Sequence, residues 1–133
     1  MVDDTPGFLV AAVDDDQRFL ESLQTLLESA DYAVRTFASG SALLACGCLA
    51  KIDFLISDID MPGMDGFELS RVVRMARPRL PIILITAHPA MQKLFSPIGL
   101  GDYRVFEKPF DGVEMLAAVA EALESTRAQN LHS

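Results

Sequence analysis

The sequence predicts a single doubly wound α/β domain, in which helices cover both faces of a parallel sheet. Short, almost wholly apolar runs alternate along the chain with segments whose apolar residues recur at helical spacing. The length of 133 residues, with 50% hydrophobic and 23% charged residues, suits one packed core. We therefore expect five strand–helix units, with the functional site beyond the carboxyl ends of the strands.

Five apolar runs are the predicted strands. Each is short, and the fourth is uniformly apolar, as expected at the centre of a parallel sheet. The predicted strands are Phe8–Val13, Tyr32–Phe37, Phe54–Ser57, Pro81–Thr86 and Tyr103–Phe106.

The segments between these runs are the predicted helices. Asp16 is the expected N-cap of the first helix and Asp111 that of the last. Ser39–Leu49 is a weaker helix because it contains Gly47, and a helix over Met91–Phe95 is short because prolines flank it. The third helix follows the loop 58–66. The polar tail from about Thr126 is expected to be loose.

Helical spacing also predicts which residues face the sheet. In the first helix these are Phe19, Leu20, Leu23, Leu26, Leu27 and Ala30. In the third they are Phe67, Leu69, Val72, Val73 and Ala76, and in the last they are Val113, Leu116, Ala117, Ala120 and Leu123.

Charge and apolar runs exclude several classes of function. The net charge of −8 opposes contact with nucleic-acid phosphates or anionic lipid, so we expect no direct nucleic-acid binding by this chain. There is no run of 18 apolar residues, and the N-terminus is acidic where a signal peptide is basic. These features predict a cytoplasmic protein without a membrane partner.

The two cysteines, Cys46 and Cys48, are separated by one residue within a predicted helix. Their side chains would then point in different directions, so we expect two reduced packing residues and no bridge. They are too few for a zinc site, and their reduced state would suit a reducing compartment.

Chemically active side chains gather where the predicted strands end. Asp14, Asp15 and Asp16 follow the first strand and Asp58 and Asp60 the third; Thr86 ends the fourth strand and Lys108 follows the fifth. Such a carboxylate cluster repels itself unless a cation neutralises it, and hard oxygen ligands favour Mg²⁺ or Ca²⁺ over zinc. The alternative for the three consecutive aspartates is a solvated helix start.

A nucleophilic carboxylate, a divalent cation, a lysine and a hydroxyl at one point suit phosphoryl transfer to an aspartate. The carboxylate of Asp58 would attack phosphorus, and Lys108 and the cation would offset charge on the phosphoryl oxygens. The hydroxyl of Thr86 can donate a hydrogen bond to one of these oxygens.

At these residues the sequence resembles the receiver domain of bacterial two-component response regulators. The matching stretches are Val13–Asp15, Leu55–Gly66 (LISDIDMPGMDG), Ile85–Ala87 and Phe106–Phe110 (FEKPF), in the expected order and spacing. The resemblance covers about residues 8–124, and it is closest to receivers that precede a helix-turn-helix DNA-binding domain. We expect residues 1–133 to be one receiver domain without an effector domain.

The resemblance implies a role for each site residue. Asp58 would be the phosphoacceptor, and Asp14, Asp15 and Asp58 would bind Mg²⁺ together with the main-chain carbonyl of Asp60. Thr86 and Lys108 would bind the phosphoryl group, with a cis Lys108–Pro109 peptide bond aiming the lysine. The implied fold is flavodoxin-like, a (βα)5 domain with strand order 2-1-3-4-5.

The resemblance also implies partners. A sensor histidine kinase or a phosphotransfer protein would donate the phosphoryl group, and the phosphorylated domain could form a homodimer. Such a domain catalyses only its own phosphorylation and dephosphorylation and is otherwise not an enzyme.

One position departs from the pattern. Three residues before the lysine, receivers usually carry a Phe or Tyr whose rotation couples phosphorylation to the output surface, whereas this chain has Val105. Tyr103 would point to the same side of the strand and could substitute, although an ordinary edge-strand tyrosine is the simpler interpretation.

Two other functions compete with a phosphorylated receiver. Asp58 and Asp60 mimic the carboxylate pair of small haloacid-dehalogenase phosphatases, but there the pair lies near the N-terminus and is followed by Gly-Thr, not by Met61-Pro62. An interaction module that has lost phosphorylation would need a broken site, and every chemical position is filled.

Asp60 and His88 lie just beyond strand ends, where they would flank the path of a water molecule that attacks the phosphoryl group. We therefore expect them to set the lifetime of the phosphorylated state. The alternative is that both are solvated loop residues.

Overall fold

The computed structural model describes residues 8–87 and 104–132, and within them the predicted parallel sheet is confirmed. Five strands pair in the order β2-β1-β3-β4-β5, every pair parallel. The described elements are β1 (Leu9–Val13), α1 (Gln17–Ser29), β2 (Ala33–Phe37), α2 (Gly40–Ala45), β3 (Phe54–Asp58), α3 (Gly66–Ala76), β4 (Ile82–Thr86), β5 (Arg104–Glu107) and α5 (Gly112–His132). The helix predicted over Met91–Phe95 lies outside the described residues.

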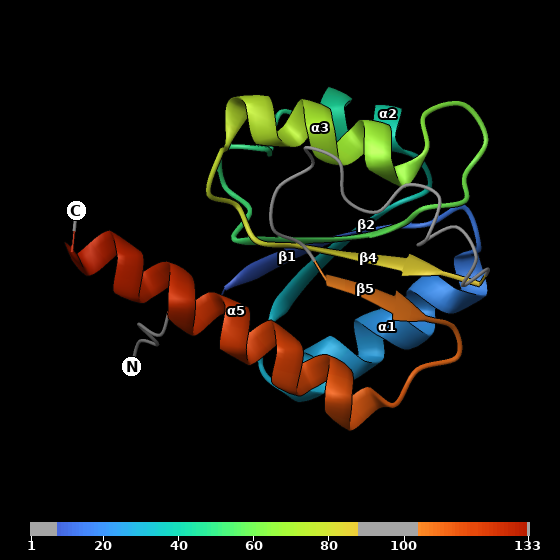
Figure 1. The fold of residues 1–133 in the computed structure, drawn as a ribbon. Coiled ribbons are helices and arrows are strands. Elements are labelled where there is room, and N and C mark those ends of the chain that lie inside the picture. The colour runs from blue at the N-terminus through green and yellow to red at the C-terminus, as the bar shows by residue number, and fades with distance from the viewer. Residues whose placement is uncertain (1–7, 88–103, 133) are drawn as a thin grey trace, which may run out of the picture.

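The sheet separates two layers of helices. α1 and α5 cover one face and α2 and α3 the other (Figure 1). Successive residues of the central strands therefore enter two different cores: Ile83 and Ile85 of β4 pack toward α1 and α5, whereas Ile82 and Leu84 pack toward α2 and α3. Burial on both faces explains why these strands are apolar throughout rather than alternating.

Side-chain caps fix where the helices begin. The Asp16 carboxylate accepts hydrogen bonds from the backbone N–H groups of Arg18 and Phe19, which confirms Asp16 as the N-cap of α1. Asp65 caps α3 in a reciprocal arrangement, in which Asp65 N–H also donates to the Glu68 carboxylate. Asp111 accepts from the backbone N–H of Val113 at the start of α5.

The inward faces of α3 and α5 differ in part from the prediction. Val72 is 39% exposed and Val113 is 76% exposed. The buried residues of α5 are Met115, Ala118, Val119 and Leu123. Small and apolar residues occur on nearly every side of this helix, so spacing alone does not select a face.

The chain from about Thr126, expected to be loose, instead continues α5 to His132. No glycine or proline interrupts the sequence between Gly112 and His132, so nothing in it stops the helix.

The expectation of two unbridged cysteines is wrong: Cys46 and Cys48 form a disulfide. The two residues do not lie in a helix, because α2 ends at Ala45 and Cys46 is its C-cap. Gly47 adopts a φ of +75°, which turns the chain so that the two side chains meet. The pair therefore gives no support for a reducing compartment.

Candidate functional site

The carboxyl ends of β1, β3, β4 and β5 bring the predicted site residues together. The pairs Val13–Ser57, Asp58–Ile85 and Thr86–Glu107 keep neighbouring strand ends nearly level. Asp14 directly follows β1, Asp58 ends β3, Thr86 ends β4 and Lys108 directly follows β5. Parallel pairing therefore brings polar residues that are far apart in sequence together at one edge of the sheet.

Asp14 links this edge to the start of α1. Its side chain is buried, and one carboxylate oxygen, Oδ1, accepts a 2.9 Å hydrogen bond from the backbone N–H of Asp16. The other oxygen, Oδ2, accepts a 2.9 Å hydrogen bond from Nζ of Lys108. Both oxygens are thus engaged, which satisfies a carboxylate that would be costly to bury alone.

Three carboxylates form a compact cluster of hard oxygen donors. One carboxylate oxygen from each of Asp14, Asp15 and Asp58 lies within 4.8 Å of the other two. Asp14 and Asp58 are buried, whereas Asp15 is exposed. An opening to solvent on the Asp15 side suits a hydrated divalent cation, since Mg²⁺ commonly retains several waters when bound by carboxylates.

Burial and neighbouring charge raise the pKa of Asp58 to about 6. Loss of solvent contact is the largest cause, and the carboxylates of Asp14, Asp60 and Asp15 also raise the pKa, while Lys108 lowers it. The surrounding acids therefore outweigh one ammonium, and a cation added to the cluster would favour the ionised, nucleophilic form.

Lys108 supplies the positive charge of the site. In addition to its hydrogen bond with Asp14, its Nζ lies 3.7 Å from Oδ1 of Asp58. Burial by itself lowers the Lys108 pKa, but the hydrogen bond to Asp14 and the charges of Asp58, Asp14 and Asp16 outweigh it and raise the pKa above its ordinary value. The Lys108–Pro109 peptide bond is cis, as predicted.

The loop after β3 packs closely against the strand end. Gly66 donates its backbone N–H to the carbonyl of Ile59, and a Cβ at Gly66 would lie 2.7 Å from Cα of Ile59. Such a contact is far too short, so only glycine fits where α3 begins. The sequence predicts a loop over 58–66 here but not this close approach.

The structure describes some of the remaining predicted residues and not others. Thr86 is buried at the end of β4, and the Asp60 side chain is exposed beyond β3, outside the three-carboxylate cluster. Val105 is half-buried and packs on the core beneath α2 and α3. His88 and Tyr103 lie outside the described residues.

Phe19 is a site neighbour that the sequence did not reveal as such. It was predicted only as part of the buried face of α1, yet its ring lies beside Lys108, with Nζ 4.1 Å from the ring centroid. An aromatic residue one helical turn after an acidic cluster is the only sequence signal, and the lysine lies 89 positions later.

A family model for the response regulator receiver domain matches residues 10–120. The chain belongs to this family. The match agrees with the acidic cluster at the strand ends and with the strand order, and it favours the receiver over the phosphatase alternative. The family is one of signalling domains of two-component systems rather than of enzymes with separate substrates.

Individual relatives agree with the match. The receiver domain is 36% identical to the DNA-binding transcriptional regulator NtrC of Salmonella typhimurium over 121 residues, which cover 91% of this chain and 26% of that protein. It is 32% identical to the transcriptional regulatory protein FixJ of Azorhizobium caulinodans, covering 90% of this chain and 57% of that protein. The receiver domain thus spans only part of each of these regulators.

The fold also agrees with a solved structure. The chemotaxis protein CheY4 of Vibrio cholerae superposes with a TM-score of 0.77 at 30% identity, covering 88% of this chain and 99% of that chain. The flavodoxin-like fold is thereby confirmed. Within the described part of the receiver domain, no helix combines the length and apolar character needed to span a bilayer.

Proposed function

We propose that this receiver domain accepts a phosphoryl group on Asp58, with Mg²⁺ bound by the neighbouring carboxylates. The observation that carries the proposal is the position of Lys108, whose Nζ is 2.9 Å from Asp14 and 3.7 Å from Asp58. A buried carboxylate that is flanked by a cation and an acidic cluster, at the edge of a parallel sheet, is suited to attack on phosphorus.

The donor set fits magnesium. The carboxylates of Asp14, Asp15 and Asp58 are hard oxygen ligands, and neither histidine nor cysteine is among them. We infer that the main-chain carbonyl of Asp60 adds a fourth protein ligand. When bound, Mg²⁺ would neutralise the cluster and the charge of the incoming phosphoryl oxygens.

Asp58, Lys108 and Thr86 would have different roles in phosphoryl transfer. An oxygen of Asp58 forms the new bond to phosphorus, while the bond from phosphorus to the donor breaks and the donor atom leaves with the electron pair. The Lys108 ammonium and the Thr86 hydroxyl would hold phosphoryl oxygens as charge shifts onto them. With a phosphohistidine donor, the leaving group is the imidazole nitrogen.

The proposed partner is a sensor histidine kinase or a phosphotransfer protein, and the proposed location is the cytoplasm, where a kinase has access to ATP. We also infer that residues 1–133 form one receiver domain, with its core over about residues 8–124. Phosphorylation would then alter a protein-interaction surface, with a homodimer as one outcome.

The proposal is tested by treating the protein with phosphoramidate, a small phosphoryl donor, and measuring the intact mass. Wild type should gain one phosphoryl group with Mg²⁺ and none with EDTA. Asp58→Asn should gain none, and Asp31→Asn, an exposed control acid outside the cluster, should behave as wild type. Equal incorporation in Asp58→Asn and wild type would overturn the assignment.

A further inference from the structure

Three aromatic rings connect the lysine of the site to the helix layer beneath it. The rings of Phe19 and Phe110 meet edge to face with centroids 5.8 Å apart, and those of Phe110 and Phe106 meet at 6.0 Å. Phe19 belongs to α1, Phe106 to β5, and Phe110 to the link into α5. Perpendicular aromatic contacts of this kind restrict the orientation of each ring.

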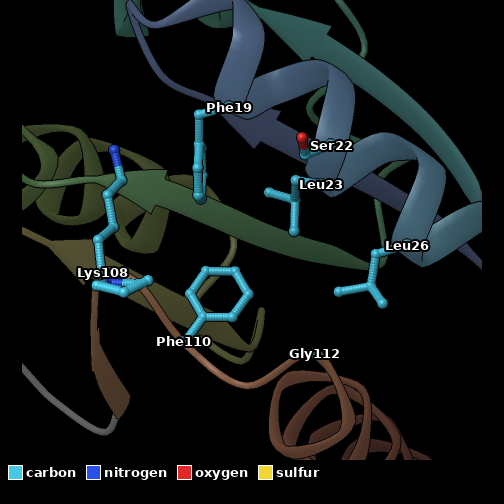
Figure 2. Close-up of a pocket in the computed structure, with 8 residues that line it drawn as sticks. Phe19, Ser22, Leu23, Leu26, Lys108, Phe110 and Gly112 are labelled. Atoms are coloured by element: carbon cyan, nitrogen blue, oxygen red, sulfur yellow. The ribbon is translucent and has the colours of Figure 1, made fainter.

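The Phe19 ring carries the Lys108 ammonium on its face. Nζ lies 4.1 Å from the ring centroid, well within the range of a cation–π interaction. Figure 2 shows the ring edge-on with its face toward the lysine, at the end of an apolar groove of about 520 Å³ between α1 and the link to α5. Lys108 is thus in contact with two carboxylates and one ring.

The backbone of Phe19 is tied to the same acidic cluster. Asp14 accepts from the N–H of Asp16, and the Asp16 carboxylate in turn accepts from the N–H of Phe19 at 3.3 Å. The first turn of α1, from which the ring projects, is therefore held close to the Asp14 carboxylate.

We propose that Phe19 is a positioning residue, which holds the Lys108 ammonium beside Asp58 for contact with the phosphoryl group. This inference rests on the proposed function of Lys108. If Mg²⁺ engages Asp14, that carboxylate is no longer available to Lys108 alone, and the ring face still attracts the ammonium. Because the ring has no formal charge, it attracts the ammonium without forming an ion pair that competes with a phosphoryl oxygen.

The first test is spectroscopic and needs neither metal nor phosphate. Protons above a ring face are shifted upfield by the ring current, so the Lys108 Hε signals should lie upfield of those of other lysines in the metal-free protein. Phe19→Leu should abolish this shift and Phe19→Tyr should keep it. An unshifted Lys108 signal in wild type would overturn the proposal.

The second test measures the rate of phosphorylation by phosphoramidate at saturating Mg²⁺. Phe19→Leu should be about three- to tenfold slower, the range expected for loss of one partly exposed cation–π contact. Phe19→Tyr, which keeps an aromatic ring at this position, should be phosphorylated at the wild-type rate. Leu26→Ala removes apolar surface from the same groove at a residue that does not contact the ammonium, so it should lower stability without slowing phosphorylation.

A double-mutant cycle separates positioning from packing. In a Lys108→Met background, Phe19→Leu should have no further effect on the rate, because the group on which the ring acts is gone. A loss of the same size in both backgrounds would show that Phe19 acts by packing and would overturn the proposal. If Lys108→Met itself leaves the rate unchanged, the proposed role of Lys108 fails instead, and this inference fails with it.

Discussion

Lys108 donates a 2.9 Å hydrogen bond to Asp14, a residue 94 positions earlier in the chain. The carboxylate that receives this bond also belongs to the cluster of Asp14, Asp15 and Asp58. In the metal-free protein, the ammonium is therefore bound to a carboxylate group that a bound cation would share. The ammonium and the metal ion are both positive and would both bind the Asp14 carboxylate, so each weakens binding of the other before phosphorylation.

Removing the ammonium should strengthen metal binding. We expect Lys108→Met to bind Mg²⁺ about three- to tenfold more tightly than wild type, because one nearby positive charge is lost, although phosphorylation slows. Titration calorimetry at pH 8 would measure the affinity. Lys51→Met, which removes an exposed lysine outside the site, should leave the affinity unchanged. Weaker binding by Lys108→Met would contradict the competition.

The raised pKa of Asp58 predicts that the free energy of unfolding of the metal-free protein falls as the pH rises. The folded-state pKa is about 6 and the ordinary value is 3.8, so between these values the folded state binds more protons than the unfolded state. The contribution of Asp58 to stability is therefore present below about pH 4 and is lost as the pH rises to about 6.

Asp58→Asn removes the titrating carboxyl group and, with it, the loss of stability that accompanies its ionisation. Relative to wild type in EDTA, the variant should gain on the order of 2 kcal/mol of unfolding free energy between pH 4 and pH 7. Urea denaturation at a series of pH values gives the difference directly. A constant difference across this range would show that the Asp58 pKa is not raised, and saturating Mg²⁺ should reduce the pH dependence.

Gly66 should tolerate no side chain. In Gly66→Ala the new Cβ would overlap the backbone of Asp58 and Ile59, and we expect a loss of roughly 2–4 kcal/mol in unfolding free energy. Gly40→Ala is the matched control, because its Cβ would meet the side chains of Met64 and Leu69, at 3.1 and 3.2 Å, which can move. Equal losses in the two variants would argue against the backbone overlap.

Asp60 and His88 remain predicted determinants of how long the phosphoryl group survives. If Asp60 contributes charge and His88 orients water, Asp60→Ala and His88→Ala should each change the dephosphorylation rate by more than about twofold, roughly 0.4 kcal/mol in the barrier. Loss of ³²P from the purified phosphoprotein would measure this rate. Smaller changes in both variants would leave them as solvated loop residues.

The apolar pattern of the chain was enough to predict the sheet and the edge at which the site lies. Continuous apolar strands such as Pro81–Thr86 can be satisfied only by burial on both faces, and parallel strands place their carboxyl ends together. The acids after Val13 and Ile56–Ser57 and the lysine before Pro109 were therefore predictable neighbours, and the structure brings them together.

Other features depend on contacts between segments that are distant in sequence, and the sequence pattern could not predict them. Spacing alone could not select the buried side of α5, because packing against the sheet chose Met115 and Val119 among many apolar residues. The Cys46–Cys48 bridge follows from the end of α2 and the positive φ of Gly47. The Phe19 ring reaches Lys108 only because α1 and the end of β5 adjoin on one face of the sheet. A short-range pattern specifies which residues are buried, whereas the partner of each side chain depends on three-dimensional packing.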